Sequence, residues 1–294
     1  MAERVSQLAA HLNYPKGMFA GQTVIITGSG QGIGAEAARL FANEGAKVVV
    51  ADIDAAKAHA VADSINKAAA GRALAVPGDV LAASYPGELV GRAAAFGGGK
   101  LHVLVNNAGY TWDGVIHKTT DGQWDAMVGV HGTAPFRLLR AAAPYFRVRD
   151  GAPRSVVNVS STSGVHGNAG QANYAFAKAG VAGLTKTVAK EWGPAFGVRA
   201  NTVAFGLIDT RLTQPREKGA FALGPAGERV ELGIPAKAAG AAAADLPPEQ
   251  KYAEIPLRRP GQPSEAAAAI LAVASPLFSY VSGQTIMVTG GRNM

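Results

Sequence analysis

The stretch "TVIITGSGQGIG", residues 23–34, decides the fold. It opens with a β-branched run typical of a buried strand, continues into a glycine turn, and leads into "GAEAARLFANEG", residues 34–45, which has the period of a helix. Such a turn directs backbone N–H groups and a helix N-terminus toward one point, where a pyrophosphate could bind. The generic pattern G-x-G-x-x-G is not met in any register, so the prediction depends on where the turn lies.

Short β-branched runs alternate with alanine-rich helical segments along the rest of the chain. This alternation predicts an α/β fold: a single Rossmann-like, doubly wound domain with a seven-stranded parallel sheet and helices on both faces. The expected strands are 23–28, 46–54, 72–80, 101–109, 154–161, 198–206 and 283–291, and the expected helices are 34–45, 55–69, 84–96, 122–145 and 171–192.

Two segments depart from this alternation. We expect residues 1–20, with Ser6 as a possible helix cap, to form an N-terminal arm before a domain that spans residues 21–294. Residues 207–254 hold no clear strand, and a stretch of that length is usually a functional lid or a disordered insertion. We favour a substrate lid, because the segment follows the sixth strand at the ligand-binding edge of the sheet. Its apolar side chains would close over an acyl chain: Leu212, Phe221, Leu223, Leu232 and Ile234.

Composition narrows the class of protein. The chain has 294 residues, of which 48% are hydrophobic and 17% charged, so it can bury a large core. It has no cysteine, which excludes disulfides and thiolate metal sites, and we expect no metal. No apolar run is long enough to span a membrane, and the first residues do not resemble a secretory signal. We therefore expect a cytoplasmic protein that does not bind a membrane. The net charge of +7 comes from scattered Lys and Arg residues that form no run, so we expect no binding to nucleic acid.

Asp52 indicates which dinucleotide would bind. It closes the second expected strand, 18 residues after Gly34. A carboxylate at this place can accept hydrogen bonds from both ribose hydroxyls of NAD and repel the 2′-phosphate of NADP. The alternative role for Asp52 is the N-cap of the next helix, which Asp54 could fill equally well. We predict NAD as the cofactor, also because Ile53 and not an arginine follows.

The sequence "NYAFAK", residues 173–178, places Tyr174 and Lys178 on one face of a helix. On a solvent-exposed face the pair would have no chemical role. Beside a cofactor, the lysine ammonium would lower the pKa of the phenol, which is otherwise about 10, and make it a usable acid and base. The spacing alone is common on helices and leaves both alternatives open.

Five motifs together resemble the short-chain dehydrogenase/reductase family over residues 20–291. They are "TGSGQGIG", "GDV" with Asp79, "NNAG" at 106–109, a serine thirteen residues before the tyrosine, and the Tyr174–Lys178 pair. The resemblance implies that Ser161 hydrogen-bonds the substrate oxygen, although Ser160 is the obvious alternative. It further implies that Tyr174 transfers the proton, and that Lys178 lowers the tyrosine pKa and holds the nicotinamide ribose.

The resemblance also implies a set of cofactor-binding positions. Asn107, Ala108 and Gly109 would line the cofactor, although Asn106 and Asn107 would also suit the role of tying strands together. Ile208 and Thr210 would meet the nicotinamide carboxamide. The full expected set is Gly28, Gln31, Gly32, Ile33, Gly34, Asp52, Ile53, Asp79, Val80, Asn107, Ala108, Gly109, Tyr174, Lys178, Ile208 and Thr210.

Two positions depart from the family pattern. His131 stands where the family usually has an asparagine that holds a water for the proton relay; imidazole can bind the same water and titrates near neutrality. A structural role in helix packing is the alternative. The (3R)-hydroxyacyl-CoA dehydrogenases of the peroxisomal multifunctional kind look similar here. Phe205 replaces a usual proline, which puts the carboxamide contacts in question.

Taken together, these features predict an enzyme that transfers a hydride between NAD(H) and a secondary alcohol or ketone. The preferred substrate is a 3-hydroxyacyl or 3-oxoacyl thioester, as for 3-oxoacyl-(acyl-carrier-protein) reductases. The alternative is a catalytically silent NAD-binding sensor or scaffold. The resemblance implies a homotetramer that pairs through the helices near 122–145 and 171–192.

Overall fold

The computed structural model describes residues 16–225, 227–235 and 247–292. Its centre is a seven-stranded sheet with the order β3-β2-β1-β4-β5-β6-β9, and all the pairings are parallel. The predicted fold is therefore confirmed. The strands are β1 (Thr23–Thr27), β2 (Lys47–Ala51), β3 (Ala73–Ala75), β4 (Val103–Asn106), β5 (Arg154–Ser161), β6 (Val198–Phe205) and β9 (Thr285–Val288).

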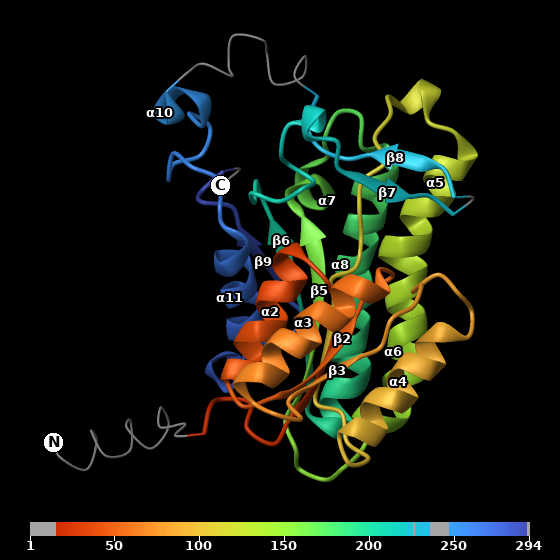
Figure 1. Cartoon of the computed structure of the whole chain (residues 1–294), viewed down its shortest axis with the longest axis vertical. Coiled ribbons are helices and arrows are strands. Elements are labelled where there is room, and N and C mark those ends of the chain that lie inside the picture. Colours follow the sequence, from red (N-terminus) through yellow and green to blue (C-terminus); the bar gives the residue numbers. More distant parts are fainter. Residues whose placement is uncertain (1–15, 226, 236–246, 293–294) are drawn as a thin grey trace, which may run out of the picture.

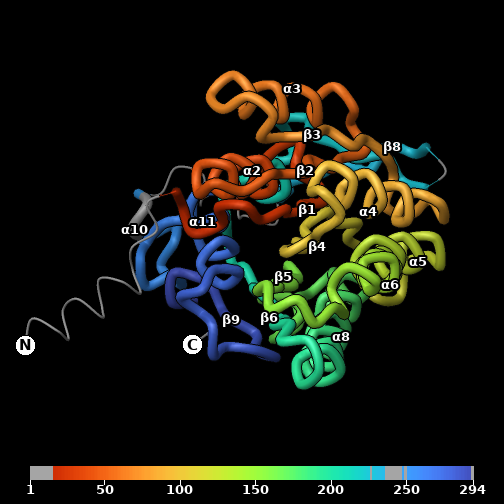
Figure 2. Tube along the Cα trace, turned by 90° about the horizontal axis from the view of Figure 1, so that it is seen from below, coloured from red at the N-terminus to blue at the C-terminus, as the bar shows by residue number. Residues whose placement is uncertain are grey.

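Helices cover both faces of the sheet (Figures 1 and 2). On one face, α2 (Gly32–Asn43), α3 (Ala55–Ala68) and α11 (Pro263–Ala274) bury their alanine-rich sides. On the other face, α4 (Tyr85–Phe96), α6 (Ala134–Phe146) and α8 (Ala172–Phe196) enclose a second core. The shorter elements are η1 (Ile116–Lys118), α5 (Asp121–Val128), η2 (Gly129–Thr133), α7 (Thr162–His166), η3 (Arg216–Lys218), α10 (Pro248–Lys251) and η5 (Pro276–Phe278).

The helix expected over 122–145 is interrupted by a π-helical turn. α5 ends at Val128, η2 forms the wide turn, and α6 begins at Ala134. Pro135 supplies the physical reason: it has no amide proton to donate to the carbonyl of His131, four residues earlier, and its ring crowds that carbonyl. The wider turn accommodates the proline and carries His131, and such turns recur at functional sites.

The expectation that residues 207–254 hold no strand is wrong. β7 (Phe221–Leu223) and β8 (Arg229–Glu231) form an antiparallel hairpin apart from the main sheet. Its turn is closed by the Gly224 N–H, which donates to the carbonyl of Glu228. Both strands have only three residues, too few for period-2 alternation to be visible in the sequence.

Part of the expected N-terminal arm packs on the domain. Phe19 is 1% exposed and meets Phe41 of α2 edge to face, with ring centroids 4.6 Å apart. Ser6, with the rest of residues 1–15, lies outside the described residues, as does the alanine-rich stretch 236–246 of the expected lid.

Candidate active site

The glycine turn between β1 and α2 fits a closely approaching ligand backbone. Gly28 has φ +64°, and a Cβ there would lie 2.7 Å from Cα of Ala108. A Cβ on Gly34 would lie 2.2 Å from the carbonyl oxygen of Gly28, so α2 could not pack this near the turn with any larger residue. The turn opens at the N-terminus of α2, where free N–H groups favour a phosphate. Gln31, Gly32 and Ile33 are the first residues of this helix start.

Asp52 lies beside this turn, at the end of β2. Its Oδ2 accepts a hydrogen bond from the Gly30 N–H at 2.8 Å, and its Oδ1 accepts one from the Asp54 N–H at 3.0 Å. The N-cap of α3 is Asp54, whose side chain accepts from the Lys57 N–H. The alternative role considered for Asp52 therefore belongs to its neighbour. Ile53 is 66% exposed next to the carboxylate, which suits a residue that covers an adenosine.

The expected cofactor residues after β3 and β4 reach the same edge of the sheet. Oδ1 of Asp79 accepts from the Leu81 N–H at 2.8 Å, which fixes the turn that holds Val80. Nδ2 of Asn107 donates to the carbonyls of Thr27 and Gly28, so the asparagine ties β4 to the glycine turn. Asn106 donates to Asn158 of β5 at 2.8 Å. Both asparagines therefore connect neighbouring strands or turns. Asn107 does so at the edge of the sheet where the cofactor is expected to bind.

Ser160 and Ser161 are distinguished by their hydrogen bonds. Ser160 is buried and donates its hydroxyl proton to the carbonyl of Lys178 at 2.7 Å. Ser161 ends β5, accepts from the Ser163 N–H at 3.1 Å, and lies near enough to Tyr174 for its hydroxyl to lower the pKa of that phenol. The structure thus brings Ser161, and not Ser160, to the tyrosine.

Tyr174 and Lys178 share one face of α8, as expected, but their electrostatics differ from the expectation. Burial raises the pKa of Tyr174 to about 12, although the neighbouring Ser161 hydroxyl opposes the rise. Burial also lowers the pKa of Lys178 to about 7. The Lys178 ammonium donates to the carbonyl of Val159 at 2.7 Å and lies 5.7 Å from the centroid of the tyrosine ring. In this arrangement burial dominates the Tyr174 pKa and the ammonium of Lys178 is directed to the carbonyl of Val159, so the lowering of the tyrosine pKa by the lysine beside a cofactor stays a prediction.

His131 faces the same site from the π-helical turn. Its Nε2 lies 2.7 Å from the carbonyl oxygen of Tyr110 and therefore carries the proton, while its buried Nδ1 has no hydrogen-bond partner within the described part of the chain. Burial and the nearby Lys178 hold the His131 pKa well below its usual value. The expected titration near neutrality is therefore wrong, and the ring is a neutral acceptor.

The residues after β6 begin the lid. Phe205 is a core residue, paired with Ser161 in β5 and with Val288 in β9. Ile208 is buried and bridges to Gly261. The Thr210 N–H donates to Oγ1 of Thr213, and its own Oγ1 accepts from the Leu212 N–H. These local hydrogen bonds hold the turn at Thr210 without the missing proline, and the expected contacts of Ile208 and Thr210 with the carboxamide stay a prediction.

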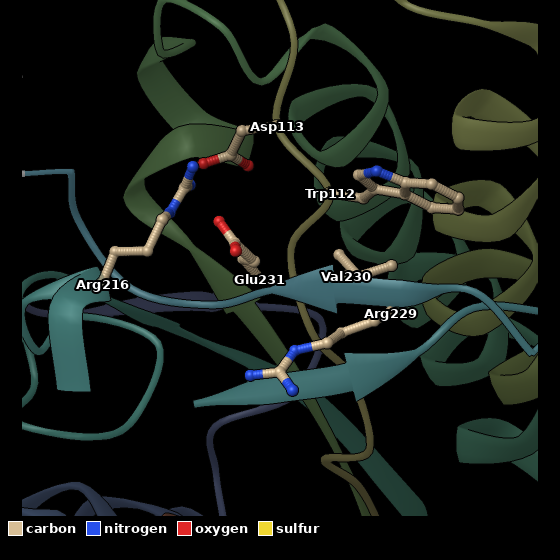
Figure 3. A pocket seen from close by; sticks show the side chains of 6 residues that line it. All are labelled: Trp112, Asp113, Arg216, Arg229, Val230 and Glu231. Carbon is tan, nitrogen blue, oxygen red and sulfur yellow. The ribbon is translucent and has the colours of Figure 1, made fainter. Parts of the chain in front are cut away.

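A charged pocket of about 350 Å³ separates the β7–β8 hairpin from the loop after β4 (Figure 3). The figure shows Arg216 reaching toward Asp113 from the lid side. The sequence did not predict this pocket and indicated an apolar lid; of the apolar residues named for it, Phe221 and Leu223 are exposed and Leu232 is buried. The lining residues are Trp112, Asp113, Arg216, Arg229, Val230 and Glu231.

A chain of hydrogen bonds joins this pocket to Ser161. Nε2 of Gln171 donates to both carboxylate oxygens of Asp113, at 3.1 and 3.2 Å. Oε1 of Gln171 accepts from the Ser163 hydroxyl at 2.8 Å, and the Ser163 N–H donates to Ser161. Asp113 and Gln171 are separated by 58 residues, so no sequence spacing indicates their contact. Burial raises the pKa of Asp113, and the negative charge of Asp113 adds to burial in raising the pKa of Tyr174.

Within the described residues, no group of three or more His, Asp or Glu side chains could hold a metal ion. The helices of this described part include none that is both long and apolar enough to cross a bilayer.

A doubly wound parallel sheet with a glycine turn, an acid after β2 and a Ser–Tyr–Lys group at one edge defines a dinucleotide-binding oxidoreductase. The chain belongs to the short-chain dehydrogenase family. Residues 22–220 match the model described as short chain dehydrogenase, and residues 220–293 match the one described as enoyl-(acyl carrier protein) reductase. The expected family is confirmed, and membership implies a nicotinamide cofactor and an enzyme acting on CH–OH groups.

Several relatives are similar over most of the chain. The 3-oxoacyl-(acyl-carrier-protein) reductase FabG of Thermotoga maritima is 37% identical over 92% of this chain and 97% of its own. The hydroxyacyl-CoA dehydrogenase ChsB1 of Mycobacterium tuberculosis is 41% identical over 62% of this chain and 60% of its own. The crystal structure of a short-chain dehydrogenase described as glucose/ribitol dehydrogenase, from Brucella melitensis, superposes with a TM-score of 0.75 at 25% identity and covers 95% of this chain and 99% of its own.

Proposed function

We propose that this protein is an NAD-dependent dehydrogenase or reductase of a 3-hydroxyacyl or 3-oxoacyl thioester. The observation that carries the proposal is the grouping of Ser161, Tyr174 and Lys178 at the edge of the sheet where the glycine turn opens: Ser161 ends β5, and Lys178 lies 5.7 Å from the ring of Tyr174 and donates to the carbonyl of Val159 in the same strand. The names of the relatives support an acyl thioester as the substrate.

In the proposed reaction, the substrate oxygen lies between the Ser161 and Tyr174 hydroxyls. Oγ of Ser161 accepts the Ser163 N–H, so the serine's own proton is its donor; it is directed to the Tyr174 oxygen here and would donate to the substrate oxygen when a substrate binds between the two hydroxyls. Tyr174 gives a proton to the oxygen in reduction and removes it in oxidation. The nicotinamide, when bound, supplies or accepts the hydride at the carbon. Lys178 and His131 would connect the tyrosine to a proton path, His131 through its unpartnered Nδ1.

The pocket beside this site is charged, which favours a substrate with a polar portion next to its reacting carbon. The thioester of a 3-oxoacyl group is followed by a carrier arm with amide groups, which both donate and accept hydrogen bonds. Asp113 and Arg216 can offer both kinds of partner at the pocket wall. An apolar alcohol without such an arm would gain no hydrogen bond from this charged pocket.

A panel of substrates tests the proposal. Purified protein is mixed with NAD and with hydroxyacyl-CoA, steroid, sugar or simple alcohol, and NADH absorbance is followed. We expect turnover with the hydroxyacyl thioester. Tight NAD binding without turnover on any substrate would instead support the silent sensor or scaffold, against which the intact Ser161, Tyr174 and Lys178 argue.

The choice of NAD over NADP depends on Asp52. A 2′-phosphate would place like charges close together, at a cost of about 1–3 kcal/mol, roughly a ten- to hundredfold loss of affinity. Calorimetric titration should give tighter binding for NAD, and Asp52→Asn should narrow the gap. Equal binding of both dinucleotides to the unaltered protein would overturn the assignment.

A homotetramer is part of the proposal, and so is a cytoplasmic location, which stays a prediction from the sequence. Three aromatic side chains lie exposed on the helices expected to pair: Trp124 on α5, Phe136 on α6 and Phe176 on α8. Exposed aromatic groups of this kind are enriched in protein interfaces. Light scattering should report a particle near four times the 30.0 kDa chain mass; a monomer at all concentrations would contradict this.

A further inference from the structure

Arg211, the residue after Thr210, connects the lid to the glycine turn. Its Nη1 and Nη2 lie 3.1 and 3.2 Å from the side-chain oxygen of Gln31, in the amide orientation that satisfies both groups. Gln31 is the N-cap residue of α2, and its side chain makes no capping hydrogen bond to the helix. The guanidinium of Arg211 therefore lies at the N-terminus of α2.

The same guanidinium is tied to the hairpin. Nη1 of Arg211 donates to the carbonyl oxygen of Phe221 at 3.3 Å, and Phe221 is the first residue of β7. Arg211 thus bridges the hairpin and the glycine turn, two parts of the chain that no strand pairing joins.

Arg211 carries its charge without an ion-pair partner. Across residues 16–225, 227–235 and 247–292, no carboxylate oxygen lies within the 4.0 Å of a salt bridge with it. Asp52 and Asp54 act on it only from a greater distance, and burial lowers its pKa. Burying part of a cation without a paired anion costs desolvation free energy. An anion that binds beside the Arg211 guanidinium would offset this cost.

We propose that Arg211 binds the diphosphate of the dinucleotide cofactor and that this contact fixes the β7–β8 hairpin over the bound cofactor. The inference rests on the proposed dinucleotide function. The diphosphate is the group that fits, because the N–H groups at the start of α2 favour a phosphate at the same place and the guanidinium fork matches phosphate oxygens.

The first test measures affinity and not activity. Calorimetry compares NAD and ADP-ribose binding to the unaltered protein, to Arg211→Ala and to Arg211→Lys. The control is Arg39→Ala, which removes an arginine of α2 that pairs with Glu36 away from the turn. We expect Arg211→Ala to weaken both ligands about ten- to a hundredfold, as for the loss of a charge-assisted hydrogen bond, Arg211→Lys to recover part of the affinity, and the control to change nothing.

Adenosine and NADP distinguish binding of the diphosphate by Arg211 from two alternatives: a role in the fold and a contact with the 2′-phosphate. Adenosine has no phosphate, so its binding, followed by ligand-observed NMR, should be equal in the unaltered protein and in Arg211→Ala. An equal loss for adenosine would mean that the substitution acts through the fold and would overturn the proposal. A loss confined to NADP would mean that Arg211 contacts the 2′-phosphate, and would overturn it too.

Hydrogen exchange tests the hairpin. Saturating NAD should slow amide exchange across residues 221–231 in the unaltered protein and leave it fast in Arg211→Ala. Unchanged NAD affinity in Arg211→Ala, or equal protection in both proteins, overturns the inference alone. Absence of any dinucleotide binding by the unaltered protein would instead overturn the proposed function.

Discussion

The rings of His131 and Tyr174 meet edge to face, with centroids 5.0 Å apart and an angle of 89° between their planes. The Nδ1 of this histidine is itself buried and has no hydrogen-bond partner within the described part of the chain. An acceptor that is buried and unpaired among protein groups suits a bound water, as the relay hypothesis requires.

Replacing His131 tests the relay. His131→Ala should lower turnover about ten- to a hundredfold, in the range of one lost hydrogen bond, and leave NAD affinity unchanged. His131→Asn should recover most of the rate, because an amide also offers an acceptor. A fall in melting temperature (Tm) with unchanged turnover of the folded fraction would show that His131 only packs.

The pH dependence of His131→Asn should match that of the unaltered enzyme near neutrality. Burial and Lys178 keep the His131 pKa well below its usual value, so the imidazole stays neutral and contributes no ionisation there. Turnover is measured between about pH 6 and pH 8, the range in which an unperturbed imidazole titrates. If turnover of the unaltered enzyme falls with pH in this range and that fall is absent in His131→Asn, the neutral state of His131 is contradicted.

Gly109 makes room for His131. A Cβ at Gly109 would lie 2.1 Å from Cε1 of the imidazole, and the three nearest atoms all belong to that ring. Gly109→Ala should destabilise the protein by about 1–3 kcal/mol, as overpacked sites do. The loss of Tm should be much smaller in a His131→Ala background, where the colliding ring is gone. Equal losses of Tm with and without the His131 ring would show that Gly109→Ala does not act through a collision with that ring.

Lys178 should make stability depend on pH. Its folded pKa is lowered to about 7 by burial, so the unfolded chain binds the proton first as pH falls, and the unaltered protein loses stability between its unfolded and folded pKa values. Lys178→Met removes this loss. Its Tm relative to the unaltered protein should be higher at about pH 6 than at about pH 10, by several degrees, since one pKa unit corresponds to about 1.4 kcal/mol. A pH-independent difference would contradict the buried ammonium.

Asp113 is expected to position Ser161 through Gln171. Asp113→Ala should lower kcat about tenfold, the effect of one lost hydrogen bond, with NAD affinity unchanged. Asp113→Asn keeps an acceptor for Gln171 and should retain most of the rate. Because the Asp113 charge raises the Tyr174 pKa, its neutralisation should also shift the alkaline limb of the pH–rate profile to lower pH. Equal kcat values for Asp113→Ala and Asp113→Asn would contradict the positioning role of Asp113. An alkaline limb of the pH–rate profile that stays at the same pH would contradict it too.

The strands, the helices and the Ser–Tyr–Lys group could be predicted from the sequence, because each depends on a local pattern of residues. The β-branched runs located the strands, and the thirteen-residue spacing selected Ser161 where composition could not, since Ser160 has the same side chain. The spacing could not reveal the orientation of Lys178, which depends on the carbonyl of Val159 in another element. The contact of Asp113 with Gln171 could not be predicted either, because the two residues are 58 positions apart and meet only in the folded chain. The π-helical turn did have a signal in Pro135, four residues after His131.

The most direct test of the central claim is the rate of NADH formation from NAD and a 3-hydroxyacyl-CoA by Tyr174→Phe, measured beside its NAD affinity. The hydroxyl is the proton-transferring group in this account, so kcat should fall about 10²- to 10⁴-fold, the range of general acid–base catalysis, while NAD affinity stays the same. A Tyr174→Phe enzyme that forms NADH at the rate of the unaltered protein would contradict the account.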